Sequence, residues 1–176
     1  MSKKLKYSIV QQMKIYDSLG FNWMPFVMFS QKANIRSAVI NTDSRGFRFN
    51  SKNQINNENS IFANKKKISL ILGGSFVFGV GSSFDEFTVP GYLSNDNHEY
   101  LNLGCRAYVG IQEIISLILN INKIHKIENI VIVSGLNDLY QKNLFSSFYP
   151  DTFYFYSNFI KNMYFDNLSI RKKIFF

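Results

Sequence analysis

Three short apolar runs, each leading into a glycine, dominate the middle of the chain. They are ISLIL at 68–72, YLNLG at 100–104 and NIVIVSG at 129–135. Apolar side chains recur at helical spacing between the second and third runs, over 110–126, and residues 85–94 favour a helix between the first and second. Near-continuous apolar strands that alternate with helices predict an α/β fold whose parallel sheet is covered on both faces.

The first part of the chain has a different pattern. Apolar residues at helical spacing predict a helix over 4–19 that ends at Gly20. Residues 21–29 are aromatic but short and interrupted by a proline, so we expect a packed connection there. Residues 50–67 are polar and asparagine-rich, which is typical of a loop. We therefore divide the chain into an N-terminal helix with a polar lead-in (1–67) and an α/β domain (68–176).

Composition narrows the classes of function. The 176 residues suffice for one domain, and the net charge of +8 is scattered apart from short lysine and arginine clusters, so we expect no nucleic-acid partner. A single cysteine excludes an internal disulfide, and two histidines without cysteine partners predict no metal site. No apolar run reaches the roughly 18 residues that a membrane span needs, and the N-terminus does not resemble a signal peptide, so we expect a cytoplasmic protein.

The carboxyl ends of the predicted strands carry the candidate chemistry, because ligands of parallel sheets bind at that edge. Ser75 follows the first strand and a Gly-Gly pair, where a sharp turn exposes a hydroxyl for attack on an acyl carbon. The oxyanion that forms needs hydrogen-bond donors. Gly104 offers a backbone N–H after the second strand, and Asn137 offers a side-chain N–H after the third.

Three segments in this order resemble the conserved blocks of SGNH/GDSL hydrolases. They are GGSFVFGVGSSFDEFTVPGYL (73–93), NLGCRAYVGIQE (102–113) and VSGLNDLY (133–140). Upstream, NTDSRGFRFN (41–50) resembles an N-x-x-G-F-R segment of some bacterial members. The resemblance implies a flavodoxin-like three-layer α/β/α sandwich, incomplete at its C-terminal side, and hydrolysis or transfer of ester-linked acyl groups. It implies Ser75 as the nucleophile, Gly104 and Asn137 as oxyanion donors, and no cofactor.

Two departures from the family pattern affect the expected activity. Gly74 stands where the family has aspartate, which leaves the nucleophile in place. The family's D-x-x-H block is missing, since no histidine follows Asn137. His98, in a predicted loop, and His125, at a helix end, are expected to be ordinary surface residues. A serine without a base is a poor nucleophile, so the chain as written should be inactive or nearly so.

Other residues near the blocks have simpler expected roles. Asp138 should shape its turn through backbone hydrogen bonds, and Cys105 should be a small buried side chain. The glycine-rich segment at 79–84 does not bind nucleotides by a known motif. It lacks the lysine of a phosphate loop, and Phe84 replaces the third glycine of a dinucleotide fingerprint.

Three interpretations remain open. The chain is a truncated hydrolase, or a non-catalytic descendant that binds acylated sugars or polysaccharides, or a subunit whose aspartate and histidine come from a partner chain. Residues 139–176 contain thirteen aromatic residues and show no further strand of the 129–135 type. A sheet that ended at 129–135 would expose an apolar edge, which favours aggregation.

Overall fold

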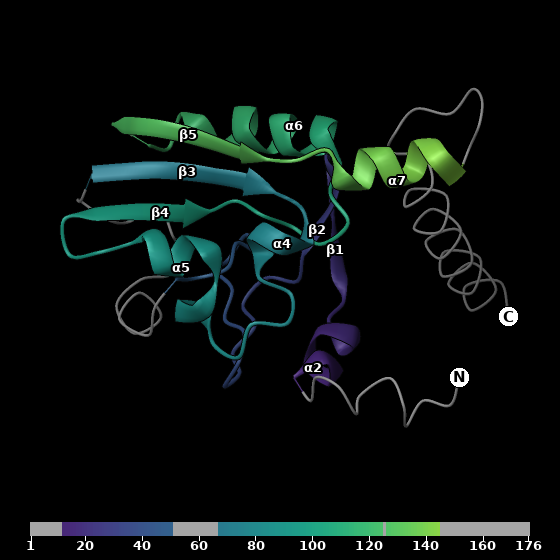
Figure 1. Ribbon diagram of the computed structural model, residues 1–176, viewed down its shortest axis with the longest axis horizontal. Coiled ribbons are helices and arrows are strands. Elements are labelled where there is room, and N and C mark those ends of the chain that lie inside the picture. Colours follow the sequence, from purple (N-terminus) through teal and green to yellow (C-terminus); the bar gives the residue numbers. More distant parts are fainter. Residues whose placement is uncertain (1–11, 51–66, 125, 145–176) are drawn as a thin grey trace, which may run out of the picture.

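The central feature of the fold is a parallel sheet of three strands. The computed structural model describes residues 12–50, 67–124 and 126–144. Within them β3 (Lys67–Gly73) lies between β4 (His98–Asn102) and β5 (Ile127–Val133), and both neighbours run parallel to it (Figure 1). β3 is buried over its last six residues, as a strand covered on both faces must be. The predicted α/β, flavodoxin-like class with an incomplete sheet is confirmed.

Helices connect these strands, and one of them differs from the sequence-based expectation. α4 (Ser75–Phe78) follows β3, α6 (Gly110–Ile121) precedes β5, and α7 (Leu136–Leu144) follows it. The expected helix over 85–94 is instead a 3-10 turn, η1 (Asp85–Phe87), and a separate helix, α5 (Val89–Leu93). The two are separated because Thr88 is extended and its hydroxyl accepts a hydrogen bond from the N–H of Gly91, so a new helix begins there.

The N-terminal segment forms a hairpin that the sequence did not predict. α2 (Met13–Ser18) is followed by β1 (Phe21–Met24) and β2 (Met28–Gln31), which pair antiparallel. The expectation of a packed connection over 21–29 was therefore wrong. Pro25, which suggested an interruption, lies in the tight turn between the strands, where its carbonyl accepts a hydrogen bond from the N–H of Val27 at 2.8 Å.

Residues 47–49, which precede β3 in the sequence, belong to the same hydrophobic core as the sheet. Phe47 and Phe49 are buried and pack with the apolar side chains of β3 and β4. The backbone of Arg48, between them, forms an antiparallel β-bridge with Asn102 at the end of β4. Burying one such aromatic side chain contributes about 1.5–3 kcal/mol. The lead-in that we assigned to 1–67 thus contributes its residues 47–49 to the core of the α/β unit.

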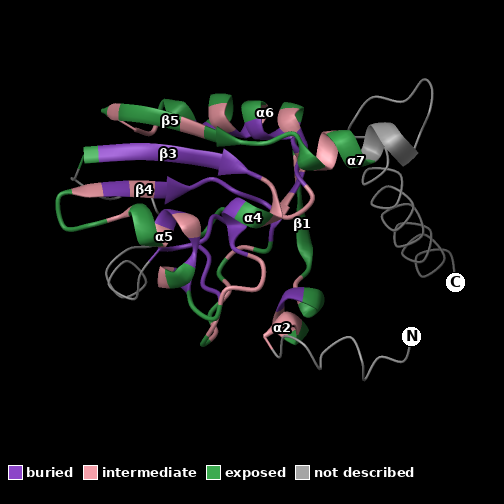
Figure 2. Ribbon diagram, viewed as in Figure 1, coloured by how far each residue is buried: buried purple, intermediate pink, exposed green. Residues whose placement is uncertain are grey.

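Figure 2 shows exposed residues along α6 and β5, and several of these residues are apolar. Three isoleucines of α6 do not face the core: Ile111, Ile114 and Ile118 are 50%, 47% and 62% exposed, whereas the polar Gln112 and Glu113 are buried. β5 is an edge strand of the described sheet, with Ile130 and Ile132 also exposed. Among the described residues, the apolar strand β5 therefore lies at one edge of the sheet. Within the described ranges, none of the helices has the length and apolarity to cross a membrane.

Candidate functional site

Ser75 is the first residue of α4, at the carboxyl end of the central strand. The chain turns directly from β3 into this helix through Gly73 and Gly74. A Cβ atom on Gly73 would lie 2.4 Å from Cγ2 of Val77 and 2.6 Å from the carbonyl oxygen of Val133. Both contacts are shorter than real Cβ contacts, so only glycine allows this turn. Ser75 itself is half-buried.

Asn137 lies against the same turn, although it is 62 positions further along the chain (137 − 75). Its Nδ2 atom donates to the carbonyl of Tyr108 at 2.6 Å. The Cβ position of Gly74 would be 2.8 Å from Nδ2 and 3.4 Å from the Tyr108 carbonyl. The loops that follow β3, β4 and β5 therefore meet around Gly74, as expected for the carboxyl edge of a parallel sheet.

Gly104 is buried behind α4, and its backbone N–H has a partner. The N–H donates to Oδ1 of Asn102 at 3.0 Å. A Cβ atom on Gly104 would lie 2.5 Å from the N of Phe78 and 2.8 Å from the backbone carbon of Val77. Glycine is required here because α4 packs directly on the backbone after β4. The N–H acts on an oxyanion only if it first leaves Asn102.

Asp138, in the first turn of α7, contacts the start of α6. Its two carboxylate oxygens accept the N–H of Gly110 at 3.0 and 3.2 Å. A negative charge at a helix N-terminus is stabilising. The expected backbone hydrogen bonds of Asp138 are present, but they go to α6 and not to its own turn.

Glu113 is a buried carboxyl close to Asp138. Burial raises the pKa of Glu113, the hydroxyl of Ser134 opposes that shift, and the charge of Asp138 adds to it. The side chain is 2% exposed, and its Oε2 has no hydrogen-bond partner among the described residues. The charged form is therefore disfavoured, and this part of the site favours a neutral carboxyl.

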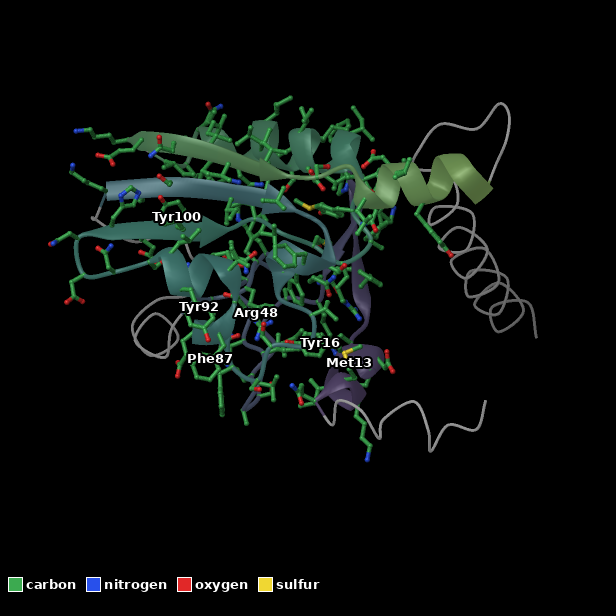
Figure 3. The ribbon with its side chains drawn as sticks, viewed as in Figure 1. Met13, Tyr16, Arg48, Phe87, Tyr92 and Tyr100 are labelled. Carbon is green, nitrogen blue, oxygen red and sulfur yellow. The ribbon has the colours of Figure 1, made fainter. Side chains whose placement is uncertain are left out.

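A buried arginine, Arg48, hydrogen-bonds to the C-terminal end of α4. This residue was given no role of its own in the sequence analysis. Arg48 is completely buried, and its Nε atom pairs with Oδ1 of Asp85 at 2.7 Å. Its Nη1 donates to the Tyr16 hydroxyl at 2.9 Å and to the carbonyls of Phe78 at 3.1 Å and Gly79 at 2.9 Å. In Figure 3, Arg48 lies between α5 and the helix that carries Tyr16.

The network around Arg48 fixes the end of the helix that Ser75 begins. Gly79 ends α4 in the left-handed region at φ +84°, and its carbonyl also accepts the hydroxyl of Tyr16 at 2.7 Å. Asn41, the first residue of the segment resembling N-x-x-G-F-R, donates Nδ2 to Asp85 Oδ2 at 2.7 Å. Through Asn41 and Arg48, the segment 41–50 therefore fixes the C-terminal end of α4, the helix that Ser75 begins. The arginine in that segment was visible in the sequence, but its partner Asp85 was not.

His98 is too far from Ser75 to act as its base. It begins β4, rather than lying in a loop, and its Nε2 atom is 2.8 Å from the hydroxyl of Ser69. Ser69 precedes Gly73 by four residues, about 13 Å at the usual strand rise. Nδ1 of His98 lies 3.5 Å from Glu128 Oε2. Because Ser69 is fully buried, these contacts join the three strands and present no accessible nucleophile.

The remaining expectations concern Cys105, His125 and metals. Cys105 is 3% exposed, which confirms the predicted buried side chain, and burial raises the pKa of its thiol to about 12. His125 lies outside the described residues. Among the residues that are described, none of the clusters of histidine, cysteine and carboxylate side chains is large enough to hold a metal ion.

Comparison with known proteins adds no further assignment: no protein-family model and no curated protein matches the chain.

Proposed function

We propose that the chain contains the nucleophile and oxyanion part of an SGNH-type serine hydrolase that acts on ester-linked acyl groups. One observation carries the proposal: Asn137 Nδ2 lies against the Gly74–Ser75 turn, 2.8 Å from the Cβ position of Gly74. A serine at the end of a parallel strand and an amide donor beside it are what an acyl-transfer site requires. Acyl groups on carbohydrates are the substrates that the family resemblance favours.

The proposed reaction begins with attack by the Ser75 hydroxyl on the acyl carbon of the ester. The carbonyl oxygen becomes an oxyanion, which Asn137 Nδ2 stabilises after it turns from the Tyr108 carbonyl. Gly104 adds its N–H once this leaves Asn102. The alkoxide leaves with the serine proton, and the acyl group remains on Ser75 until water releases it. Each oxyanion donor in such a site contributes about 10²–10³ in rate.

A base is the part of this site that the described residues do not supply. Their one histidine, His98, lies at the far end of the sheet. Without a base the hydroxyl keeps its proton, and acylation is slow. The aspartate and histidine would come from a partner chain, or from sequence outside the described residues, and exogenous imidazole would replace them chemically.

A second candidate function is binding without catalysis, to acylated sugars or polysaccharides. The observation in its favour is that both proposed oxyanion donors already have partners, Tyr108 for Asn137 and Asn102 for Gly104. In this case the residues around Ser75 contact the acyl group, and the hydroxyl serves only as a hydrogen-bond donor or acceptor.

The two functions are separated by capture of an acyl-enzyme. The chain is incubated with p-nitrophenyl acetate and imidazole, and peptide mass spectrometry locates any acetyl group. The hydrolase proposal predicts an imidazole-dependent acetyl group on Ser75 that is absent in Ser75→Ala. Ser83→Ala is the matched control, because Ser83 is an exposed serine of the following loop. Equal acetylation of Ser75 and Ser83 would contradict the hydrolase proposal.

A further inference from the structure

The β1–β2 hairpin lies against the loop that borders Ser75. Gln112 Nε2 donates to the carbonyl of Val27 at 2.9 Å, and the Tyr108 hydroxyl donates to the carbonyl of Phe29 at 3.0 Å. The carbonyl of Tyr108 accepts Asn137 and also lies close to Gly74. Tyr108 thus contacts both the hairpin and the Ser75 turn, and Figure 1 shows β1 beside α4 at this end of the sheet.

The turn of the hairpin places Phe26 in a strained backbone conformation and leaves its side chain exposed to solvent. Phe26 has φ +67° and is 77% exposed, at the centre of a turn that the Val27–Pro25 hydrogen bond closes. Such a γ-turn is rare and strained. Met28 follows at φ +78°. Non-glycine residues in this region cost about 1–3 kcal/mol each and cluster at binding sites, and the exposed Phe26 ring buries little surface in the fold.

Aromatic residues of the hairpin also lie next to Tyr108. Trp23 is 52% exposed on β1 and lies opposite Phe29 in the strand register. The ring of Phe29 is 5.7 Å from that of Tyr108. We propose that this hairpin is the carbohydrate-binding wall of the Ser75 site, with Trp23 and Phe26 as the contacting residues, an inference that rests on the proposed function.

Sugar rings suit these side chains better than acyl chains do. A pyranose has an apolar C–H face and a rim of hydroxyls, and an indole likewise has an apolar face and an N–H at its edge. An acyl chain gains most when apolar walls enclose it. Trp23 is about half exposed on β1, so its indole is open to a ligand without being enclosed by apolar walls.

Trp23 is the single tryptophan of the chain, so its fluorescence reports on this surface alone. The full chain is titrated with O-acetylated xylo-oligosaccharide. We expect a saturable fluorescence change that Phe26→Ala weakens about tenfold, the usual effect of one aromatic contact. Tyr92→Ala, which removes a 72% exposed ring from α5, is the matched control and should leave the affinity unchanged.

Phe26→Gly is a second variant, for which a loss of stability cannot explain weaker binding. Glycine relieves the strain at φ +67°, so this variant should be as stable as the parent or more stable, and should still bind the sugar about tenfold more weakly. An unchanged affinity in both Phe26 variants would overturn the proposal. Equal affinity for glyceryl triacetate, an acyl ester without a sugar ring, would overturn the carbohydrate assignment.

The fluorescence titration and the acyl-enzyme test distinguish failure of the hairpin proposal from failure of the hydrolase proposal. Ser75→Ala should retain sugar binding, because Trp23 and Phe26 remain. A Trp23 response without any acetyl group on Ser75 supports the hairpin and rejects the hydrolase. An acetyl group on Ser75 without a Trp23 response supports the hydrolase and rejects the hairpin.

Discussion

Replacing Arg48 with methionine tests the claim that a buried ion pair supports the Ser75 helix. Methionine keeps much of the apolar volume but removes every donor of the guanidinium. Asp85, which is 5% exposed, then keeps only the hydrogen bonds from Asn41 and loses its cation. The Val39 carbonyl, 2.7 Å from Nη2, also loses its guanidinium donor.

The expected loss of stability in Arg48→Met depends on the polar groups that stay buried without the guanidinium. Removing one partner of a buried ion pair costs about 3–5 kcal/mol, because the other charge is left uncompensated. A lost hydrogen bond to a buried carbonyl adds about 1 kcal/mol. We therefore expect Arg48→Met to lower the free energy of unfolding by about 4 kcal/mol or more, out of the roughly 5–15 kcal/mol of a typical domain.

Urea unfolding followed by far-ultraviolet circular dichroism measures this loss. Arg45→Met is the matched control: Arg45 is exposed and its side chain donates to Asn120 Oδ1 at 2.9 Å, so the change should stay within about 1 kcal/mol. Adding Asp85→Asn to Arg48→Met removes the uncompensated charge and should recover about 1–3 kcal/mol. A loss of less than about 1 kcal/mol in Arg48→Met would refute the reasoning.

Two further predictions concern buried titratable groups. Cys105, with a thiol pKa of about 12, should not react with a thiol reagent at pH 8 in the folded chain, and should react at once in urea; fast labelling of the native chain would contradict its burial. Burial raises the folded-state pKa of Glu113 above the ordinary value of 4.5, so its contribution to stability is full below that pH and is lost as the pH rises through the folded-state pKa. Glu113→Gln should therefore lose less stability than the parent chain between pH 4.5 and 7.5, as thermal melts across that range would show; parallel melting curves would count against this.

The central strand β3 could be predicted from sequence because it is buried over its last six residues. Residues such as Leu70 and Leu72 are fully buried, so the run 68–72 had to be almost continuously apolar. Glycines at the strand ends marked the turns, because α4 packs where a Cβ atom of Gly73 or Gly104 would clash. Local requirements of this kind are visible in one segment of sequence.

The hairpin and the arginine network were missed because they depend on pairing between distant segments. Phe21–Met24 resembles a connection until Met28–Gln31 pairs with it. Arg48 is an unremarkable basic residue until Asp85, 37 positions later (85 − 48), is placed beside it. The helix over 110–126 was predicted correctly for its first twelve residues, but the face it buries was not, because that depends on which elements lie around it.

The candidate site was predicted in part. Ser75 and Asn137 were expected at strand ends, and the fold brings the loops that carry them together around Gly74. The N–H of Gly104 was expected to be available, but it donates to Asn102, a side chain two residues earlier whose direction a sequence pattern does not indicate.

The most direct test of the central claim is the rate at which Ser75 is acylated in Asn137→Ala. With p-nitrophenyl acetate and imidazole, we expect the parent chain to form acetyl-Ser75, and Asn137→Ala to form it about 10²–10³ times more slowly, the usual loss for one oxyanion donor. Circular dichroism would confirm that the variant remains folded. An unchanged rate in the folded variant would contradict the account, because Ser75 and Asn137 would then not act as one site.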